Sequence, residues 1–240
     1  MLHVQRLAFL LALLATSTFS CRAAPPANPK KAYSFVFLVT GPKAAEKTSE
    51  ENRTIMTGHM ANMKRLSEEG MLLIAGPFAK PTPDDQLRGI FILDTPEITT
   101  ARAWVQTDPG VEAGAFATEI VPFRTDAPLK RSLELFKAET AEIEKSGKPG
   151  GLTDRIRPYA MILAQDGERA ERAIAKAHAE DKVIFAGNLE GSPRGSYLAI
   201  LDVKDTSEAE ALLGSGSLGE KDLVGWWSAK TVAEIAKAGK

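Results

Sequence analysis

One histidine of this chain is placed where it could move a proton. His59 belongs to GHMANMKRLSEEGMLLIAGPF (58–78), a segment typical of a helix followed by an apolar strand. An imidazole titrates near neutral pH, so it can accept or donate a proton in a reaction. On the margin of a stripe of methionines, it can equally be a packed side chain with one hydrogen bond. The segment alone leaves both interpretations open.

The remaining composition excludes several other kinds of chemistry. Three histidines and one cysteine cannot build a closed Cys/His zinc site, and one cysteine cannot form an intrachain disulfide. A formal net charge of -1 gives no electrostatic reason to expect nucleic acid or an anionic membrane as a partner. We therefore expect no metal, no cofactor and no nucleic acid, and a small-molecule ligand as the plausible partner.

The first residues have the layout of an export signal. Arg6 precedes an apolar run over residues 7–15 that is too short to span a bilayer, which predicts a signal peptide over residues 1–20. A flexible tether over residues 21–32 follows. TFSC (18–21) resembles a bacterial lipoprotein signal, although Thr18 and Phe19 depart from it, and ordinary cleavage is equally workable. We expect a periplasmic or lipid-anchored envelope protein, whose only membrane contact, in the lipid-anchored case, is a lipid on Cys21.

Three segments of the chain occur twice in the same order. YSFVFLVTG (33–41) matches YAMILAQDG (159–167), EEGMLLIAGPF (68–78) matches AEDKVIFAGNL (179–189), and RGIFILD (88–94) matches RGSYLAILD (194–202). Three matches in one order indicate a tandem duplication.

Each copy predicts the same elements, as judged from apolar spacing and turn residues. The first copy predicts strands at 33–39, 71–78, 89–94 and 116–123 with helices at 54–69 and 96–108. The second predicts strands at 159–165, 182–188, 196–203 and 223–232 with helices at 167–181 and 206–213. This β-α-β-β-α-β order is the ferredoxin-like arrangement, which leaves one apolar sheet face uncovered.

The predicted fold class is therefore α+β, with two ferredoxin-like domains paired within the chain as an α/β barrel. The domains span residues 33–126 and 158–236, and a connecting helix and linker occupies residues 127–157. Because the second copy would replace a partner subunit, we expect a monomer or a weak homodimer.

The first copy resembles the YciI (YCII-related) family of the dimeric α/β-barrel superfamily. The resemblance rests on GHMANMKRLSEEGMLLIAGPF, GIFIL and TARAWVQTDPGVEAGAFATEIVPF, and covers most of residues 33–124, whereas residues 158–234 match only in framework. It implies a ferredoxin-like fold paired into a barrel and a catalytic His-Asp dyad at His59 and Asp108. One branch resembles dehydrochlorinases and the superfamily includes muconolactone isomerase, which implies a small organic ligand but no particular reaction.

Such a dyad is chemically workable, because a carboxylate that orients an imidazole makes it a general base. A lyase, isomerase or hydrolase reaction would suit it. Asp108 also precedes Pro109 near a helix end, where aspartate commonly serves as a cap. The alternative function is a non-catalytic envelope module for binding or interaction, so the sequence leaves open whether the protein is an enzyme.

The second copy lacks both members of this pair. Aligning the two Ala-Gly dipeptides places Ala170 opposite His59, and GSGSLG (214–219), which contains no acid, opposite Asp108. His178 falls opposite Ser67 and is not a displaced equivalent. We therefore expect the second copy to serve as the other half of the barrel, with one site per chain.

Overall fold

The computed structural model describes residues 30–147, 151–219 and 221–237, so the predicted signal peptide and Cys21 lie outside the described residues. The first half contains β1 (Lys31–Thr40), η1 (Ala44–Glu46), α1 (Ser49–Glu68), β2 (Leu72–Pro77), β3 (Leu87–Leu93), α2 (Ile98–Val105), α3 (Pro109–Glu112) and β4 (Phe116–Thr125). Helices α4 (Arg131–Ser146) and α5 (Leu152–Arg155) follow. The second half contains β5 (Ile156–Ala164), α6 (Gly167–Ala173), α7 (Ala175–Ala179), β6 (Val183–Leu189), β7 (Tyr197–Leu201), α8 (Thr206–Leu213), β8 (Leu223–Ala229) and η2 (Lys230–Glu234).

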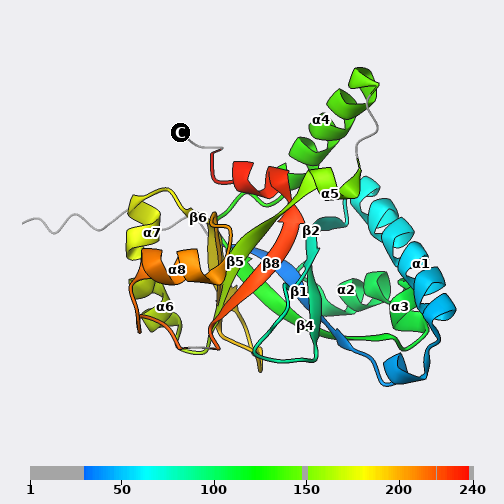
Figure 1. The fold of residues 1–240 in the computed structure, drawn as a ribbon, viewed down its shortest axis with the longest axis horizontal. Coiled ribbons are helices and arrows are strands. Elements are labelled where there is room, and N and C mark those ends of the chain that lie inside the picture. Colours follow the sequence, from blue (N-terminus) through cyan, green and yellow to red (C-terminus); the bar gives the residue numbers. More distant parts are fainter. Residues whose placement is uncertain (1–29, 148–150, 220, 238–240) are drawn as a thin grey trace, which may run out of the picture.

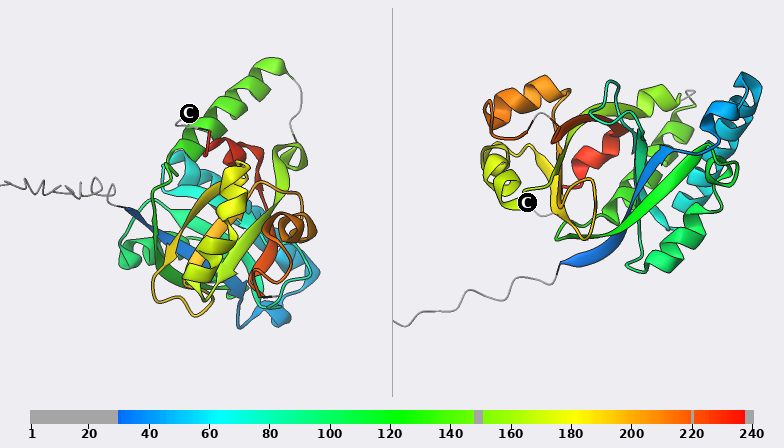
Figure 2. Two further views of the ribbon diagram at one scale, coloured as in Figure 1. Left: turned by 90° about the vertical axis from the view of Figure 1, so that its left-hand side faces the viewer. Right: turned by 90° about the horizontal axis from the view of Figure 1, so that it is seen from below.

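The strands form one antiparallel sheet that curls into a barrel (Figures 1 and 2). Its order is β2-β3-β1-β4-β6-β7-β5-β8, so the second half repeats the strand arrangement of the first. Strands β4 and β6 join the halves through the pairs Phe123–Leu189 and Arg124–Asn188. At the other junction, Phe78 forms a bridge with Trp226, which brings β2 beside β8. The predicted α+β class with two ferredoxin-like halves in one barrel is confirmed.

Apolar side chains fill the barrel and the spaces beneath its helices. The interior cluster includes Phe37, Phe123, Met161 and Trp226, together with Val232 of η2 and Ile235 directly after it. Figure 2 (right) shows η2 within the outline of the barrel. Helices α1 and α2 cover the outer face of the first half, and α6, α7 and α8 cover that of the second. None of the described helices is long and apolar enough to cross a membrane.

A glycine allows close backbone approach at each junction between the halves. A Cβ atom on Gly76 would lie 1.8 Å from the carbonyl oxygen of Trp227, and one on Gly187 would lie 2.1 Å from that of Arg124. No side chain fits at either distance. The Ala-Gly dipeptide found in both copies therefore marks the two places where the barrel closes.

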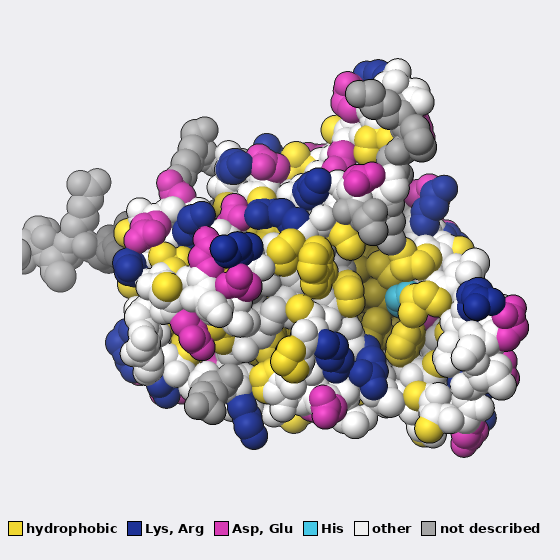
Figure 3. All heavy atoms as spheres, viewed as in Figure 1, with side chains coloured by type: hydrophobic (Ala, Val, Ile, Leu, Met, Phe, Trp, Pro, Cys, Tyr) yellow, Lys and Arg dark blue, Asp and Glu magenta, His cyan; other side chains and the backbone are white. Residues whose placement is uncertain are grey.

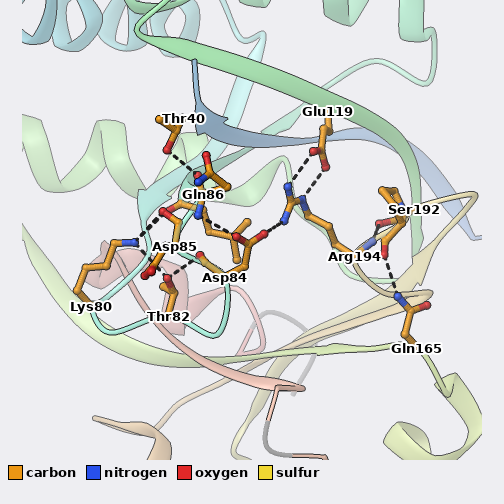
Figure 4. A network of polar contacts seen from close by, with 12 residues as sticks. Thr40, Lys80, Thr82, Asp84, Asp85, Gln86, Glu119, Gln165, Ser192 and Arg194 are labelled. Carbon is orange, nitrogen blue, oxygen red and sulfur yellow. Dashed lines mark hydrogen bonds and ion pairs between the residues drawn. The ribbon is translucent and has the colours of Figure 1, made fainter. Parts of the chain in front are cut away.

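Arg194 also connects the halves, at the mouth of the barrel (Figure 4). From the loop between β6 and β7, its Nε and Nη2 donate to the two carboxylate oxygens of Glu119 on β4, at 2.6 and 2.8 Å. Its Nη1 donates to Asp84 in the loop between β2 and β3. One guanidinium from the second half is thus paired with two acids from the first.

Three helices differ from the sequence prediction. The helix expected over residues 96–108 is α2, which ends at Val105, and Asp108 lies outside it as the cap of α3. α1 begins at Ser49 rather than at residue 54, because Thr48 and Glu51 form a capping box: each backbone N–H donates to the other's side chain. The helix expected over residues 167–181 is divided into α6 and α7 at Ile174, whose ψ of -3° departs from helical geometry while its side chain is buried among the second-half core residues.

Candidate functional site

His59 lies on the inner side of α1, between two aromatic rings. The Phe91 ring of β3 stacks on it at a centroid distance of 5.9 Å, and the Phe116 ring of β4 meets it edge-on at 5.3 Å. Only 8% of His59 is exposed. Helix α1 and the outer face of the sheet together hold the imidazole in place.

Asp108 is fully buried directly before α3 and uses both of its carboxylate oxygens. Oδ1 accepts from the backbone N–H of Gly110 at 2.8 Å, which caps α3, where Pro109 is favourable in the first turn. Oδ2 lies 2.7 Å from Nδ1 of His59. The structure therefore brings the two predicted residues into direct contact, and Asp108 is also the cap that its position beside proline predicts.

The protonation states of this pair follow from its contacts. Burial would raise the pKa of Asp108, but the hydrogen bond and charge of His59, the Gly110 N–H and the Asn62 amide outweigh burial and hold that pKa below its ordinary value. An ionised carboxylate only accepts hydrogen bonds, so Nδ1 of His59 must carry the shared proton. In the neutral ring this leaves the lone pair on Nε2, the form required of a general base.

Nε2 keeps some contact with solvent. It makes no hydrogen bond with any described residue, and it is not among the buried side-chain atoms that lack a partner. Figure 3 shows a hollow between α1 and the β2–β8 junction, lined by hydrophobic side chains and reached by a histidine. The exposed large hydrophobic residues of the described chain, Met56 on α1 and Trp227 on β8, belong to the elements that border this hollow. The histidine therefore borders a hydrophobic surface in this view.

Further polar side chains, which the sequence did not reveal, form a hydrogen-bond network with Asp108. Asn62, one turn after His59, has its Nδ2 3.4 Å from Oδ2 of Asp108. Its Oδ1 accepts from Nη2 of Arg65 at 2.9 Å and from Oγ1 of Thr107 at 3.1 Å. Asn62 is only 8% exposed. A polar amide on the buried side of an otherwise apolar helix face was the available signal.

Neither of the two described cavities contains His59. One, of about 480 Å³, lies at the barrel mouth beside Arg194, and the other, of about 450 Å³, lies on the second half between α6 and α8. The described residues include no group of three or more histidine, cysteine, aspartate or glutamate side chains arranged to hold a metal ion. In the second half, Ala170 is buried opposite His59, and residues 214–219 contain no acid.

The chain joins two ferredoxin-like halves into one barrel, and only the first half contains a buried His-Asp pair. This architecture places the protein among the α/β barrels. Residues 34–124 match the YCII-related domain. An uncharacterized protein of Haemophilus influenzae is 34% identical over 85 residues, which is 32% of this chain and 85% of that protein. The chain belongs to the YCII-related domain family.

Two solved structures show more distant likeness. The 5-chloro-2-hydroxyhydroquinone dehydrochlorinase of Burkholderia phenoliruptrix is 19% identical, covering 37% of this chain and 89% of that one, with a TM-score of 0.28. A chlorite dismutase of Candidatus Nitrospira defluvii is 10% identical, covering 88% of this chain and 96% of that one, with a TM-score of 0.49. Neither likeness assigns a reaction to this chain.

Proposed function

We propose that the protein binds a small organic molecule in the hollow beside α1 and removes a proton from it through Nε2 of His59. Asp108 orients the imidazole and holds the proton on Nδ1. The observation that carries this proposal is the 2.7 Å contact between buried Asp108 and Nδ1, which leaves Nε2 as the free, accessible nitrogen. Membership of the YCII-related family supports it.

In this proposal the Asp108 carboxylate stabilises charge, and the hydrophobic side chains of the hollow hold the ligand. When Nε2 takes a proton, the ring becomes an imidazolium, and the adjacent buried carboxylate of Asp108 stabilises that charge, while Phe91 and Phe116 pack against the ring. Hydrophobic side chains of the hollow would hold the apolar part of the ligand. Lyase and isomerase reactions that proceed through a carbanion or enolate begin with such a proton transfer, and general-base hydrolysis applies the same step to water.

Exchange of substrate C–H protons for solvent deuterium tests this step without requiring a full reaction. A panel of small lactones, cyclic enones and dihydroxybenzenes is incubated with the protein in D₂O and followed by proton NMR. The wild type is expected to accelerate exchange on at least one compound, and His59→Gln should reduce that rate about 10²- to 10⁴-fold. Asp108→Asn should also reduce it, because the amide can donate to Nδ1 and stabilise the wrong tautomer.

His178→Gln is the matched control, since His178 is exposed on α7 and lies in the other half. It should leave the exchange rate unchanged. Exchange that survives His59→Gln removes the dyad from the mechanism. Saturable binding without exchange or turnover in the wild type would instead establish the non-catalytic binding module.

A further inference from the structure

The second half carries a different group of side chains at the place where the first half carries its dyad. Because the strand order of the second half repeats that of the first, α6 and α7 occupy the place of α1, and residues 214–219 after α8 occupy the place of Asp108. Ala170 stands opposite His59. The residue before it, Arg169, makes the contact across these elements that the dyad makes in the first half.

Arg169 is fixed by the loop opposite. Its Nε donates to the carbonyl oxygen of Ser217 at 2.8 Å, and its Nη2 donates to that of Gly216 at 2.9 Å. No acidic side chain among the described residues forms an ion pair with it, and its Nη1 has no described partner. A guanidinium keeps its charge at all ordinary pH values. Arg169 is therefore a half-buried cation whose guanidinium is fixed by two hydrogen bonds, with Nη1 left to donate to a ligand.

The cavity at this position is lined by three cations and three apolar side chains. Its volume is about 450 Å³, and its lining contains no acid: Arg169, Arg172, Ala173, Ala175, Lys176, Leu213 and Ser217. Its three cations, Arg169, Arg172 and Lys176, come from α6 and α7 and line the same cavity. We call this lining the basic groove.

The acids that form ion pairs with cations of the basic groove compensate their charge only weakly. Oε2 of Glu168 lies 3.6 Å from Nη1 of Arg172, and Oε1 of Glu180 lies 3.9 Å from Nζ of Lys176. All four side chains are about half exposed or more. Exposed pairs at such distances contribute little. Asp166 is occupied as the cap of α6, where it accepts from the backbone N–H of Arg169. The positive charge of the groove is thus available to a ligand.

We propose that the basic groove is a second binding site, for a small organic anion. Nη1 of Arg169 receives its carboxylate or phosphate group, Arg172 and Lys176 add charge at the rim, and the apolar part of the ligand lies against Leu213. This site does not depend on the proposed function of His59. It makes the second half a ligand-binding half in its own right.

Titration of the ¹⁵N-labelled full chain with phenyl phosphate, followed by ¹H–¹⁵N NMR, tests the proposal. We expect saturable shifts at residues 169–176 and 213–217 at millimolar concentrations. Inorganic phosphate tests the charge alone and should bind more weakly, while phenol tests the ring alone and should not shift these residues.

Variants of the full chain test separately how the charge of the groove and the guanidinium geometry of Arg169 contribute to binding. Arg172→Gln with Lys176→Gln alters only exposed side chains and should raise the dissociation constant about tenfold. Arg169→Lys keeps the charge but loses the planar guanidinium with its several N–H donors, and should also weaken binding. Lys64→Gln on α1 and His59→Gln should leave the titration unchanged. Absence of saturable shifts in the groove, or equal affinity in the double variant, overturns the proposal.

Discussion

The carboxylate of Asp108 serves structure and chemistry with separate oxygens. Oδ1 caps α3 through Gly110, and Oδ2 bonds the imidazole of His59. A hydrogen bond to an ionised group is about twice as strong as a neutral one, so the ring of His59 cannot turn without losing a strong buried contact. A proton acceptor fixed in this way needs no reorganisation before it reacts.

The stability of the protein should depend on the charge of Asp108. Its pKa is lowered in the folded state, so its contribution is present above the unfolded value of about 3.9 and is lost as the pH falls through the folded value. Asp108→Asn should lower the free energy of unfolding by about 1–3 kcal/mol at pH 7, because a buried charge-assisted bond is lost. The difference from wild type should shrink below pH 4.

Urea unfolding at pH 7 and pH 3 measures this difference. Asp85→Asn is the control, since Asp85 is exposed at the barrel mouth and should give matching curves. A deficit of Asp108→Asn that is equally large at both pH values would show that the carboxylate charge is not responsible.

The resemblance to the YCII-related family pointed to His59 and Asp108 through short motifs, but the sequence could not show their contact. That contact depends on how α1 crosses the segment after α2, which is a tertiary property. Phe91 and Phe116 were missed for the same reason, because their role comes from the strand face on which they lie. Asn62 was missed because one polar residue in a helix has many ordinary explanations.

The strands were easier to predict than the helices. Alternating and continuous apolar runs located all eight strands to within a few residues, and the repeat fixed their order. Helix ends depend on single caps, so the capping box at Thr48 moved the start of α1, and Ile174 divided a helix that periodicity made continuous. The role of the repeated Ala-Gly dipeptides became clear only from the approach of β2 to β8 and of β6 to β4.

The junction between β2 and β8 should not tolerate a side chain at position 76. In Gly76→Ala the new methyl group would meet the Trp227 carbonyl, so the strands must separate, at a cost of about 1–3 kcal/mol in the free energy of unfolding. Gly167→Ala is the control, because its Cβ would have its nearest contact at 3.5 Å, an ordinary distance. Thermal unfolding followed by circular dichroism compares them. Equal midpoints would contradict the role of Gly76 in closure.

At the scale of the whole molecule, both sheet faces are covered within one chain. The inner faces of the two halves share one core, and helices cover the outer faces. A ferredoxin-like unit commonly needs a second subunit to cover its open face, but here the second half does so. Export and lipid attachment at Cys21 stay predictions.

Sedimentation should therefore give a monomer. The sedimentation coefficient is expected to stay constant over a wide range of protein concentration and to match a single chain, of 25.8 kDa for the full sequence. The Gly76→Ala variant should associate more readily than the wild type, because separating β2 from β8 exposes strand edges to other chains. A stable wild-type dimer would contradict the intrachain pairing of the two halves.

The bridge between Phe78 and Trp226 has one more consequence. An open sheet ends in two strands whose unpaired N–H and C=O groups can recruit another chain, which is how sheets grow into aggregates. Here the two strands that would be those edges, β2 and β8, lie against each other, and Trp226 and Ser228 also donate side-chain hydrogen bonds to the carbonyls of Gly76 and Ala75. The contact of β2 with β8 thus leaves less unpaired edge available for intermolecular sheet growth.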